Sequence, residues 1–383
     1  MTVNRFHIDV DNALIDDLKY RLKHSRWPSE IEGFSWERGT DQSYLQLLVA
    51  YWHDHFDWRK QESELNRFSH FQCTIDGIDI HFIHEQGKGR NPLPIILTHG
   101  WPDSFFRYQK IIPLLTDPAR YGGNPDDSFD VIIPSLPGFG FSGRPTIEGF
   151  NNSKVSDLWV KLMTEELGYK KFAAGGGDIG SGVTRYLAAS HPELLVGIHV
   201  TDIGIIRNIL TVQDDAVLSD EERQYKVNAQ RWIAQEGGYM ALQATKPQTL
   251  AYGLSDSPVG LAAWIIEKFR AWSDCNGELT KRFSNDELLT NIMIYWITNT
   301  ISSSAGIYYE NTHSLPALGK IEVPTGVALF PADILLPPKQ WAEQNLNISR
   351  WTTMPRGGHF TAMEEPELLA DDIRSFYRQF RTQ

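Results

Sequence analysis

Cysteine is scarce in this chain of 383 residues, and long apolar runs are absent. Only Cys73 and Cys275 occur, too few and too far apart for a disulfide framework or a thiolate metal site. The longest apolar stretch, Val259–Ile266, is far shorter than the roughly 20 residues that span a bilayer. The first 12 residues also lack the basic and apolar pattern of a signal peptide. We therefore expect a soluble chain without a membrane anchor, and a cytoplasmic location is the simplest one.

Basic residues are outnumbered by acidic ones. The chain has 36 Lys and Arg against 48 Asp and Glu, which gives a formal net charge of −12. This balance argues against nucleic acid or an anionic membrane surface as the main partner, because both attract clustered Lys and Arg. An uncharged or cationic small molecule fits better, and the 12 Trp, 14 Tyr and 19 Phe are enough to line its pocket. The sequence leaves open whether the chain forms a homo-oligomer.

The pattern of strands and helices predicts an α/β fold with a mostly parallel central sheet. Strands alternate with helices over residues 71–205 and 319–383, which we assign to one core. Residues 1–70 predict a helical, aromatic segment that packs on that core. Residues 206–318 contain helical patterns and no strand, so we expect them to form a lid over the carboxyl edge of the sheet, where ligands bind.

The stretch AAGGGDIGSG, Ala173–Gly182, fits two motifs. Its G-x-G-x-x-G spacing fits a dinucleotide-binding turn, with Asp202 near the distance of a ribose-binding acid. Its G-x-D-x-G spacing fits a nucleophile elbow centred on Asp178. Several predicted strands precede the stretch, whereas a dinucleotide fingerprint belongs to the first strand, and a carboxylate there would repel a pyrophosphate. A helix-capping role would be commoner if Asp178 stood alone, but the residues that follow favour the elbow.

A carboxylate nucleophile forms an ester, and an activated water must then release the product. The loop PRGGHF supplies His359 after the last predicted strand, and FPAD supplies Asp333 after the preceding strand. Their order along the chain, nucleophile, acid and histidine, is that of an α/β hydrolase. Asp202 is the rival position for the acid. The turn HGWP offers the amide of Trp101, which with the amide of Ile179 predicts an oxyanion hole.

These motifs together resemble one family. HGWP, SLPGFGFSGRP, GGD, FPAD and RGGHF are similar to the motifs of α/β-hydrolase-fold epoxide hydrolases, in particular the microsomal and juvenile-hormone branch. The resemblance extends through the lid stretch GGYMALQATKPQTLAYGLSDSPVGLAAWIIEKF and through the N-terminal helical segment, so it covers nearly the whole chain. It implies an enzyme that converts a small epoxide and water to a vicinal diol.

The resemblance also implies two lid tyrosines that hold and protonate the epoxide oxygen. In GYM the tyrosine is Tyr239, and in YYEN it is Tyr308, with Tyr309 as the fallback. The chain departs from the family pattern in two places near the site. Ile179 stands where the family usually has tryptophan, which makes one pocket wall smaller, and Asp103 stands where HGWP is usually followed by glycine.

The expected mechanism is attack of Asp178 on an epoxide carbon, followed by hydrolysis of the ester by a water that His359 deprotonates while Asp333 orients the ring. No metal or organic cofactor is expected. Two alternatives remain open. A haloalkane dehalogenase could use the same nucleophile, acid and histidine, but a pair of phenols suits an alkoxide better than a halide. A non-catalytic binding protein on this scaffold would not need an intact catalytic set.

Overall fold

The computed structural model describes residues 3–29, 31, 33, 35–205 and 207–381. Its strands form one sheet in the order β1-β2-β3-β5-β4-β6-β7-β8-β9. The first three strands are antiparallel, and β5, β4, β6, β7, β8 and β9 run parallel to one another. The strand bounds are Asn4–Arg5 for β1, His70–Ile75 for β2, Ile78–Glu85 for β3, Leu93–Thr98 for β4, Phe129–Pro134 for β5, Phe172–Gly176 for β6, Leu195–Val200 for β7, Ile321–Leu329 for β8 and Leu346–Thr353 for β9. The mostly parallel central sheet expected from the sequence is confirmed.

A tight hairpin joins β2 and β3, with Ile75 paired to Ile78. Its turn residues Asp76 and Gly77 have φ values of 50° and 80°, a left-handed conformation that aspartate and glycine tolerate. Strand β1 was not expected, because two residues carry no readable alternation. It extends the sheet by pairing antiparallel to β2.

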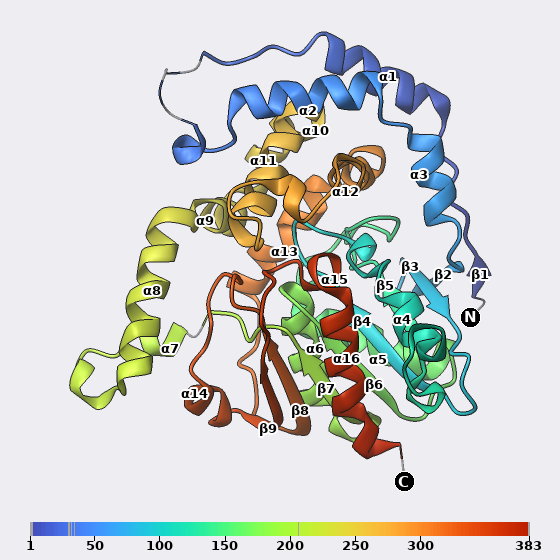
Figure 1. The fold of residues 1–383 in the computed structure, drawn as a ribbon, viewed down its shortest axis with the longest axis vertical. Helices are drawn as coiled ribbons and strands as arrows, with labels where there is room; N and C mark the ends of the chain where they lie inside the picture. Colours follow the sequence, from blue (N-terminus) through green and yellow to red (C-terminus); the bar gives the residue numbers. More distant parts are fainter. Residues whose placement is uncertain (1–2, 30, 32, 34, 206, 382–383) are drawn as a thin grey trace.

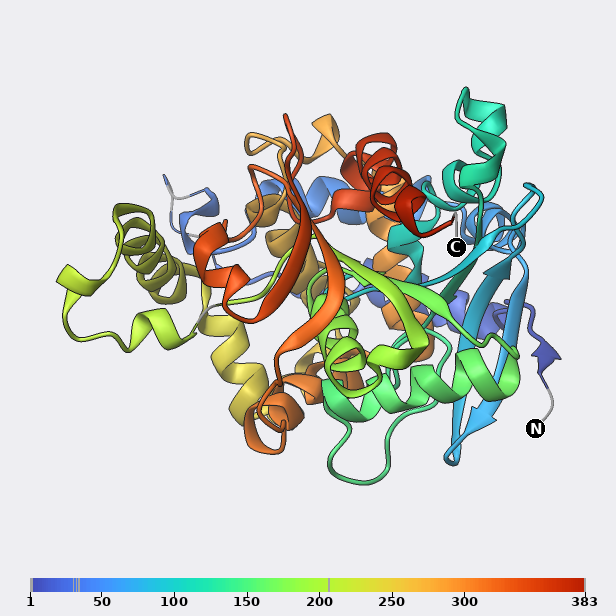
Figure 2. The ribbon, with the colours of Figure 1, turned by 90° about the horizontal axis from the view of Figure 1, so that it is seen from below.

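Helices cover both faces of the sheet. Figure 2 shows the helices α5 and α6, in green, on one side of the sheet and α16, in red, on the other. The helices of this core have the bounds Ile112–Thr116 for α4, Asn152–Lys161 for α5, Ile179–Ser190 for α6, Lys339–Glu343 for α14, Thr361–Glu364 for α15 and Pro366–Tyr377 for α16. This layering buries the parallel strands on both faces, as their continuous apolar sequences require.

A helical cap separates β7 from β8 in the chain. Its helices are Arg207–Leu210 for α7, Asp220–Glu236 for α8, Gly238–Thr245 for α9, Pro247–Asp256 for α10, Pro258–Trp272 for α11, Asn285–Thr298 for α12 and Ile301–His313 for α13. Capping boxes begin two of them, Ser219 with Glu222 at α8 and Ser284 with Glu287 at α12. Figure 1 shows the cap above one edge of the sheet, with α8 extending to the left.

The N-terminal helices lie against this cap. They are Asn12–Lys23 for α1, Gln42–Asp54 for α2 and Trp58–Leu65 for α3, and they contact α11 and α12 (Figure 1). Tyr51 donates a hydrogen bond of 2.9 Å to Asp286 of α12, and Arg21 forms an ion pair of 2.7 Å with Asp256 of α10. The apolar stripe of α2 therefore stabilises the cap, while β1 joins the sheet.

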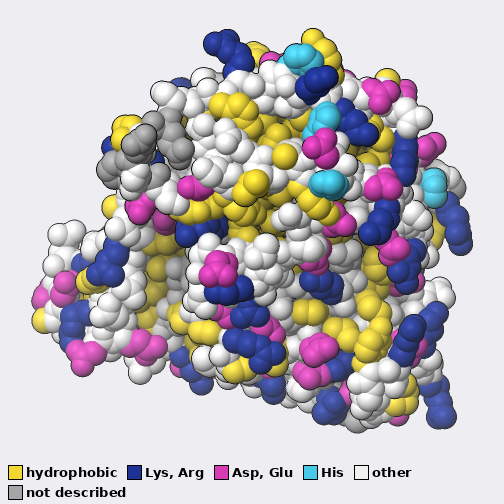
Figure 3. Space-filling view, turned by 45° about the horizontal axis from the view of Figure 1, so that its top comes forward, with side chains coloured by type: hydrophobic (Ala, Val, Ile, Leu, Met, Phe, Trp, Pro, Cys, Tyr) yellow, Lys and Arg dark blue, Asp and Glu magenta, His cyan; other side chains and the backbone are white. Residues whose placement is uncertain are grey.

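One continuous hydrophobic core joins the sheet, the cap and the N-terminal helices. A second, smaller cluster of Ile209, Leu218, Tyr225 and Ala229 holds α7 and α8 together. On the face shown in Figure 3, Lys and Arg side chains are interspersed with Asp and Glu. Within the part of the chain that the structure describes, no helix is both long enough and apolar enough to cross a bilayer.

Candidate active site

The turn between β6 and α6 is a sharp one, and its central residue is Asp178. The backbone of Asp178 has φ 57° and ψ −127°, which is strained for a residue with a side chain. A β-carbon at Gly180 would lie only 1.9 Å from the carbonyl oxygen of Thr98, and one at Gly176 would lie 2.5 Å from Gly180. Glycine is required at both positions, so the G-x-D-x-G sequence has the geometry of a nucleophile elbow.

Hydrogen bonds fix the Asp178 carboxylate in one orientation. The amide of Trp101 donates to Oδ1 at 2.8 Å, and the Asp178 amide donates to Oδ2 of Asp202 at 2.6 Å. The other carboxylate oxygen, Oδ2, lies 3.5 Å from Nε2 of His359. One oxygen is thus held by a backbone donor, while the other faces the histidine.

His359 and Asp333 come from the loops that follow β9 and β8. Nδ1 of His359 donates to Oδ1 of Asp333 at 2.7 Å, and a bridge between Ala332 and Gly358 holds the two loops side by side. The Nε2 atom of His359 is buried and has no hydrogen-bond partner among the described residues. It is therefore available to a water or to a reacting group near Asp178.

Two carboxylates control the charge of His359. Burial alone would lower the pKa of its ring, but the neighbouring carboxylates of Asp333 and Asp178 raise it to about 10. The resting site therefore favours an imidazolium between two carboxylates.

Asp202, the rival for the acid position, lies beside the elbow. Among the described residues, the carboxylate that forms a hydrogen bond with the His359 ring is that of Asp333, not that of Asp202. Its Oδ1 accepts from the amide of Gly204 at 3.0 Å, in addition to the Asp178 bond. Burial and the negative charge of Asp333 raise the pKa of Asp202 to about 6. Asp202 is placed to support the elbow through the Asp178 amide, whereas Asp333 is placed to orient the ring of His359.

Both tyrosines implied by the family resemblance face Asp178 from the cap. Tyr239 of α9 and Tyr308 of α13 have ring centroids 5.9 Å apart, and Trp101 stacks on Tyr239 at 5.2 Å. Tyr309 is 39% exposed and stacks on His313 instead. Burial, together with the nearby charge of Asp178, raises the pKa of Tyr239, so its hydroxyl keeps its proton at neutral pH.

These side chains border a cavity of about 200 Å³ between the sheet and the cap. The polar side chains that line it are Asp178, Asp202, Asp333, His359, Tyr239 and Tyr308. The apolar side chains that line it are Ile179, Ile205, Trp232, Met240, Ile334 and Leu335. No group of His, Cys, Asp and Glu suited to a metal ion occurs among the described residues. The cavity can bind a small, mostly apolar molecule next to a carboxylate, an imidazole and two phenols.

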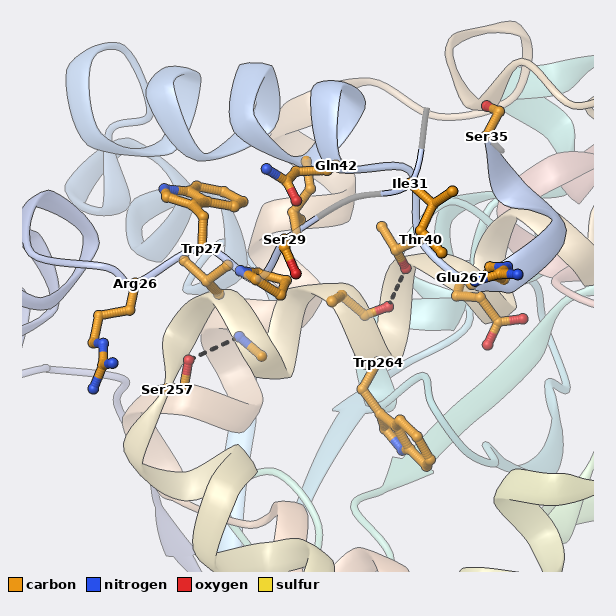
Figure 4. A pocket seen from close by; sticks show the side chains of 17 residues that line it. Arg26, Trp27, Ser29, Ile31, Ser35, Thr40, Gln42, Ser257, Trp264 and Glu267 are labelled. Carbon is orange, nitrogen blue, oxygen red and sulfur yellow. Dashed lines mark hydrogen bonds between the residues drawn. The ribbon is translucent and has the colours of Figure 1, made fainter. Parts of the chain in front are cut away.

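A larger cavity of about 760 Å³ lies elsewhere, between the N-terminal segment and α11. Figure 4 shows Trp27, Ser29 and Gln42 on one side of it and Ser257 on the other, and a 2.7 Å hydrogen bond from Thr40 to the carbonyl of Ala263 crosses between them. Among the described residues that line it there is no histidine and no elbow. Size therefore does not identify the reactive site; the arrangement of groups around Asp178 does.

Sequence reasoning missed the buried groups that support the histidine loop. Arg107 donates to the carbonyl of His359 at 2.6 Å and to Asp103 at 2.5 Å, and Asp103 accepts from the amide of Gly100 at 2.9 Å. Although burial opposes ionisation, Arg107 lowers the pKa of Asp103 to about 2. The only signal in the sequence was Asp103 in place of the usual glycine.

A buried glutamate supports the same loop from the other side. Glu364 accepts hydrogen bonds from the amides of Gly358, Phe360 and Asp274 at 3.1, 3.0 and 2.8 Å. Burial raises the pKa of its carboxyl to about 7. Nothing in the local sequence marks Glu364, because its partners are backbone amides that only the folded loop presents.

Comparison with known proteins agrees with this geometry. The family model described as the epoxide hydrolase N terminus matches residues 3–108, and that described as the alpha/beta hydrolase fold matches residues 94–366. Epoxide hydrolase 1 of Oryctolagus cuniculus is 40% identical over 98% of this chain and 88% of its own length. The juvenile hormone epoxide hydrolase structure from Bombyx mori is 29% identical, has a TM-score of 0.85, and covers 100% of this chain and 94% of its own. An Aspergillus niger epoxide hydrolase structure, 28% identical, has a TM-score of 0.86 and covers 99% of this chain and 97% of its own.

The sheet topology and the elbow define an α/β hydrolase. Within that class, the matched N-terminal model and the 40% identity over nearly the full length show that the chain belongs to the epoxide hydrolase family. The family and the fold expected from the sequence motifs are thereby confirmed.

Proposed function

We propose that this epoxide hydrolase acts through a covalent ester on Asp178. In the first step, Oδ2 of Asp178 attacks an epoxide carbon, the carbon–oxygen bond of the ring breaks, and the electron pair moves to the oxygen. Tyr239 and Tyr308 hold that oxygen, and one phenol gives it a proton. The supporting observation is the orientation of Asp178, whose Oδ1 is bonded to the Trp101 amide while Oδ2 is left to react.

In the second step, His359 takes a proton from a water that attacks the carboxyl carbon of the ester. The amides of Trp101 and Ile179 stabilise the oxyanion, as the 2.8 Å bond from Trp101 already suggests. The departing alkoxide takes the proton from His359 and leaves as part of the diol. The remaining proton of the water passes from the Asp178 carboxyl to His359, which restores the carboxylate and the imidazolium of the resting site.

Formation of the ester explains how His359 becomes a base. The carboxylate of Asp178 helps to hold the histidine pKa near 10 in the resting site. Esterification removes that negative charge, so the pKa of His359 falls and the imidazolium gives its proton to the phenolate left by ring opening. The neutral ring can then accept a proton from the attacking water. The loss of the Asp178 charge thus makes His359 a base only after the ester has formed.

The cavity favours an uncharged epoxide with a small apolar substituent. Its carboxylates, Asp178, Asp202 and Asp333, would repel an anionic substrate. The apolar walls, including Ile179, fit an alkyl or aryl group. We further propose a cytoplasmic location, supported by Cys73 and Cys275, which are both free and buried.

A single-turnover reaction in oxygen-18 water tests the ester. Excess enzyme is mixed with styrene oxide, and both the diol and the peptide that contains Asp178 are analysed by mass spectrometry. We expect unlabelled diol and label in the Asp178 carboxyl. Label that goes directly into the first-turnover diol would refute the covalent route, and release of halide from a haloalkane without any diol would favour the dehalogenase.

Single substitutions separate the two candidate acids. We expect Asp333→Asn to slow ester hydrolysis by about 10²–10⁴-fold, so that ester accumulates, because His359 loses its acceptor at 2.7 Å. Asp202→Asn keeps an oxygen for the Asp178 amide and should not accumulate ester. Rapid quench followed by mass analysis of the Asp178 peptide measures this, and the opposite pattern would assign the acid to Asp202.

A further inference from the structure

Helix α11 presents a buried lysine to the cavity tyrosine from behind. The side chain of Lys268 is only 6% exposed, and its ammonium lies 4.9 Å from the centre of the Tyr239 ring. The same ammonium lies 5.9 Å from the rings of Trp264 and Trp272. Three aromatic rings therefore surround one positive charge, and one of them belongs to a phenol in the catalytic cavity.

The ion pair of Lys268 is asymmetric. Its carboxylate partner is the adjacent Glu267, whose side chain is 23% exposed and reaches the larger cavity seen in Figure 4. Solvent weakens the field of Glu267 more than that of Lys268, because water reaches the carboxylate and hardly reaches the ammonium. Within this pair, the ammonium is therefore the less screened charge at the Tyr239 ring.

We propose that Lys268 is a positioning residue for ring opening, which acts through Tyr239 by stabilising negative charge on that phenol and on the epoxide oxygen bonded to it. This inference rests on the proposed function. It adds a residue outside the cavity walls to the machinery of the first step only.

The direction of charge movement gives the physical reason. During ring opening, negative charge leaves Asp178 and appears on the epoxide oxygen, and part of it passes to the phenol that donates its proton. A cation fixed over the face of the phenol favours that displacement, and its effect is large because the surroundings are dry. In the second step negative charge develops on the Asp178 carboxyl oxygen held by the Trp101 amide, and positive charge develops on His359, so Lys268 should matter little there.

Other charges near Tyr239 oppose the lysine. Glu236 of α8 and Glu267 of α11 both raise the pKa of Tyr239, after burial and the charge of Asp178. Without Lys268 the phenol would face carboxylates alone. Within the part of the chain that the structure describes, Lys268 is the cation that lies over the Tyr239 ring and offsets these carboxylates.

The experiment compares Lys268→Met, which keeps the length of the side chain and loses its charge, with Lys268→Arg, which keeps the charge. Rapid quench with styrene oxide gives separate rate constants for formation and hydrolysis of the Asp178 ester. We expect Lys268→Met to slow ester formation about tenfold or more, to leave ester hydrolysis within about twofold, and to be rescued largely by arginine. Lys281→Met, at an exposed lysine, is the matched control.

Two further variants test charge against packing. Glu267→Gln breaks the same ion pair but removes the opposing charge, so ester formation should stay equal or become faster. In a Tyr239→Phe background, Lys268→Met should have little additional effect, because the lysine acts through the hydroxyl of that ring.

The inference is overturned if Lys268→Met leaves ester formation unchanged, or slows both steps equally, or if Glu267→Gln slows ester formation as much. If Lys268→Met does not fold, the arginine and Glu267 variants still decide, since a Lys268→Arg enzyme that forms ester about tenfold more slowly, or a slower Glu267→Gln enzyme, contradicts the charge effect. If the unsubstituted enzyme forms no ester at all, the proposed function fails first, which is a separate result.

Discussion

The charge state of His359 depends on the two carboxylates beside its ring, and this dependence can be measured. A histidine whose pKa is raised to about 10 in the folded protein stabilises the fold fully below its unfolded value of about 6.5. That contribution is lost as the pH rises from about 6.5 through about 10. The same charge that stabilises the resting protein must be removed before His359 can act as a base.

We expect Asp178→Asn to abolish diol formation, by about 10⁴-fold or more, and to lower the pKa of His359. The amide keeps the shape of the side chain but removes the negative charge 3.5 Å from Nε2. Histidine ring titration by NMR measures the shift, and intact mass verifies that the amide has not deamidated. A histidine pKa equal to that of the unsubstituted protein would contradict our account of the second step.

The neighbouring tyrosines Tyr308 and Tyr309 offer a matched pair. Tyr308→Phe should slow ester formation by about 10–10²-fold, because it removes a donor to the developing alkoxide. Tyr309→Phe should change it by less than about twofold, since this ring is 39% exposed and lies outside the cavity lining. Single-turnover kinetics compare the two, and equal effects would show that cavity position does not decide the role.

Residues were predictable where a motif fixes the backbone around them. The elbow sequence singled out Asp178, and chain order singled out Asp333 and His359, because strand ends meet at one edge of a parallel sheet. Arg107 and Glu364 were not predictable, because each acts through backbone groups that only the folded loops bring together. The choice between Tyr308 and Tyr309 depends on which face of α13 points into the cavity. Two adjacent tyrosines in the sequence do not reveal that face.

Among the elements, the segment after β4 contains the buried ion pair of Asp103 and Arg107, and Arg107 joins it to the loop after β9 by its hydrogen bond to the carbonyl of His359. Arg107→Met would leave Asp103 charged and unpaired, and we expect it to lower the free energy of unfolding by about 3–5 kcal/mol. The double variant Asp103→Asn with Arg107→Met should recover part of this loss. Thermal and urea unfolding measure both, and a double variant less stable than the sum of the singles would contradict a simple pair.

Elements with alternating or continuous β-branched sequences, such as β4 and β5, were predictable from sequence because burial on the sheet dictates their composition. The two-residue strand β1 was not predictable, because its pairing with β2 depends on how the helical segment between the two strands folds. The contact of α2 with α11 and α12 was also missed. An apolar stripe shows that a helix is covered and does not show by what.

The molecule as a whole has one main hydrophobic core that includes the sheet, the cap and the N-terminal helices. We therefore expect the N-terminal helices and the cap to unfold together. Asp286→Ala removes the acceptor of both Tyr51 and Gln61, and it should speed hydrogen exchange in α2 and α12 in parallel. Exchange measured by mass spectrometry tests this, and acceleration confined to α2 would show that the N-terminal segment opens on its own.

The cavity is built from two regions of the chain with different tasks. Asp178, Asp333 and His359 follow strands β6, β8 and β9, whereas Trp232, Tyr239, Met240 and Tyr308 come from the cap. The cap residues of the cavity could therefore be substituted during evolution without disturbing the residues at the strand ends. For protein engineering this division makes Trp232 and Met240 the natural positions for varying which mirror-image epoxide is accepted, while the hydrolytic residues are left untouched.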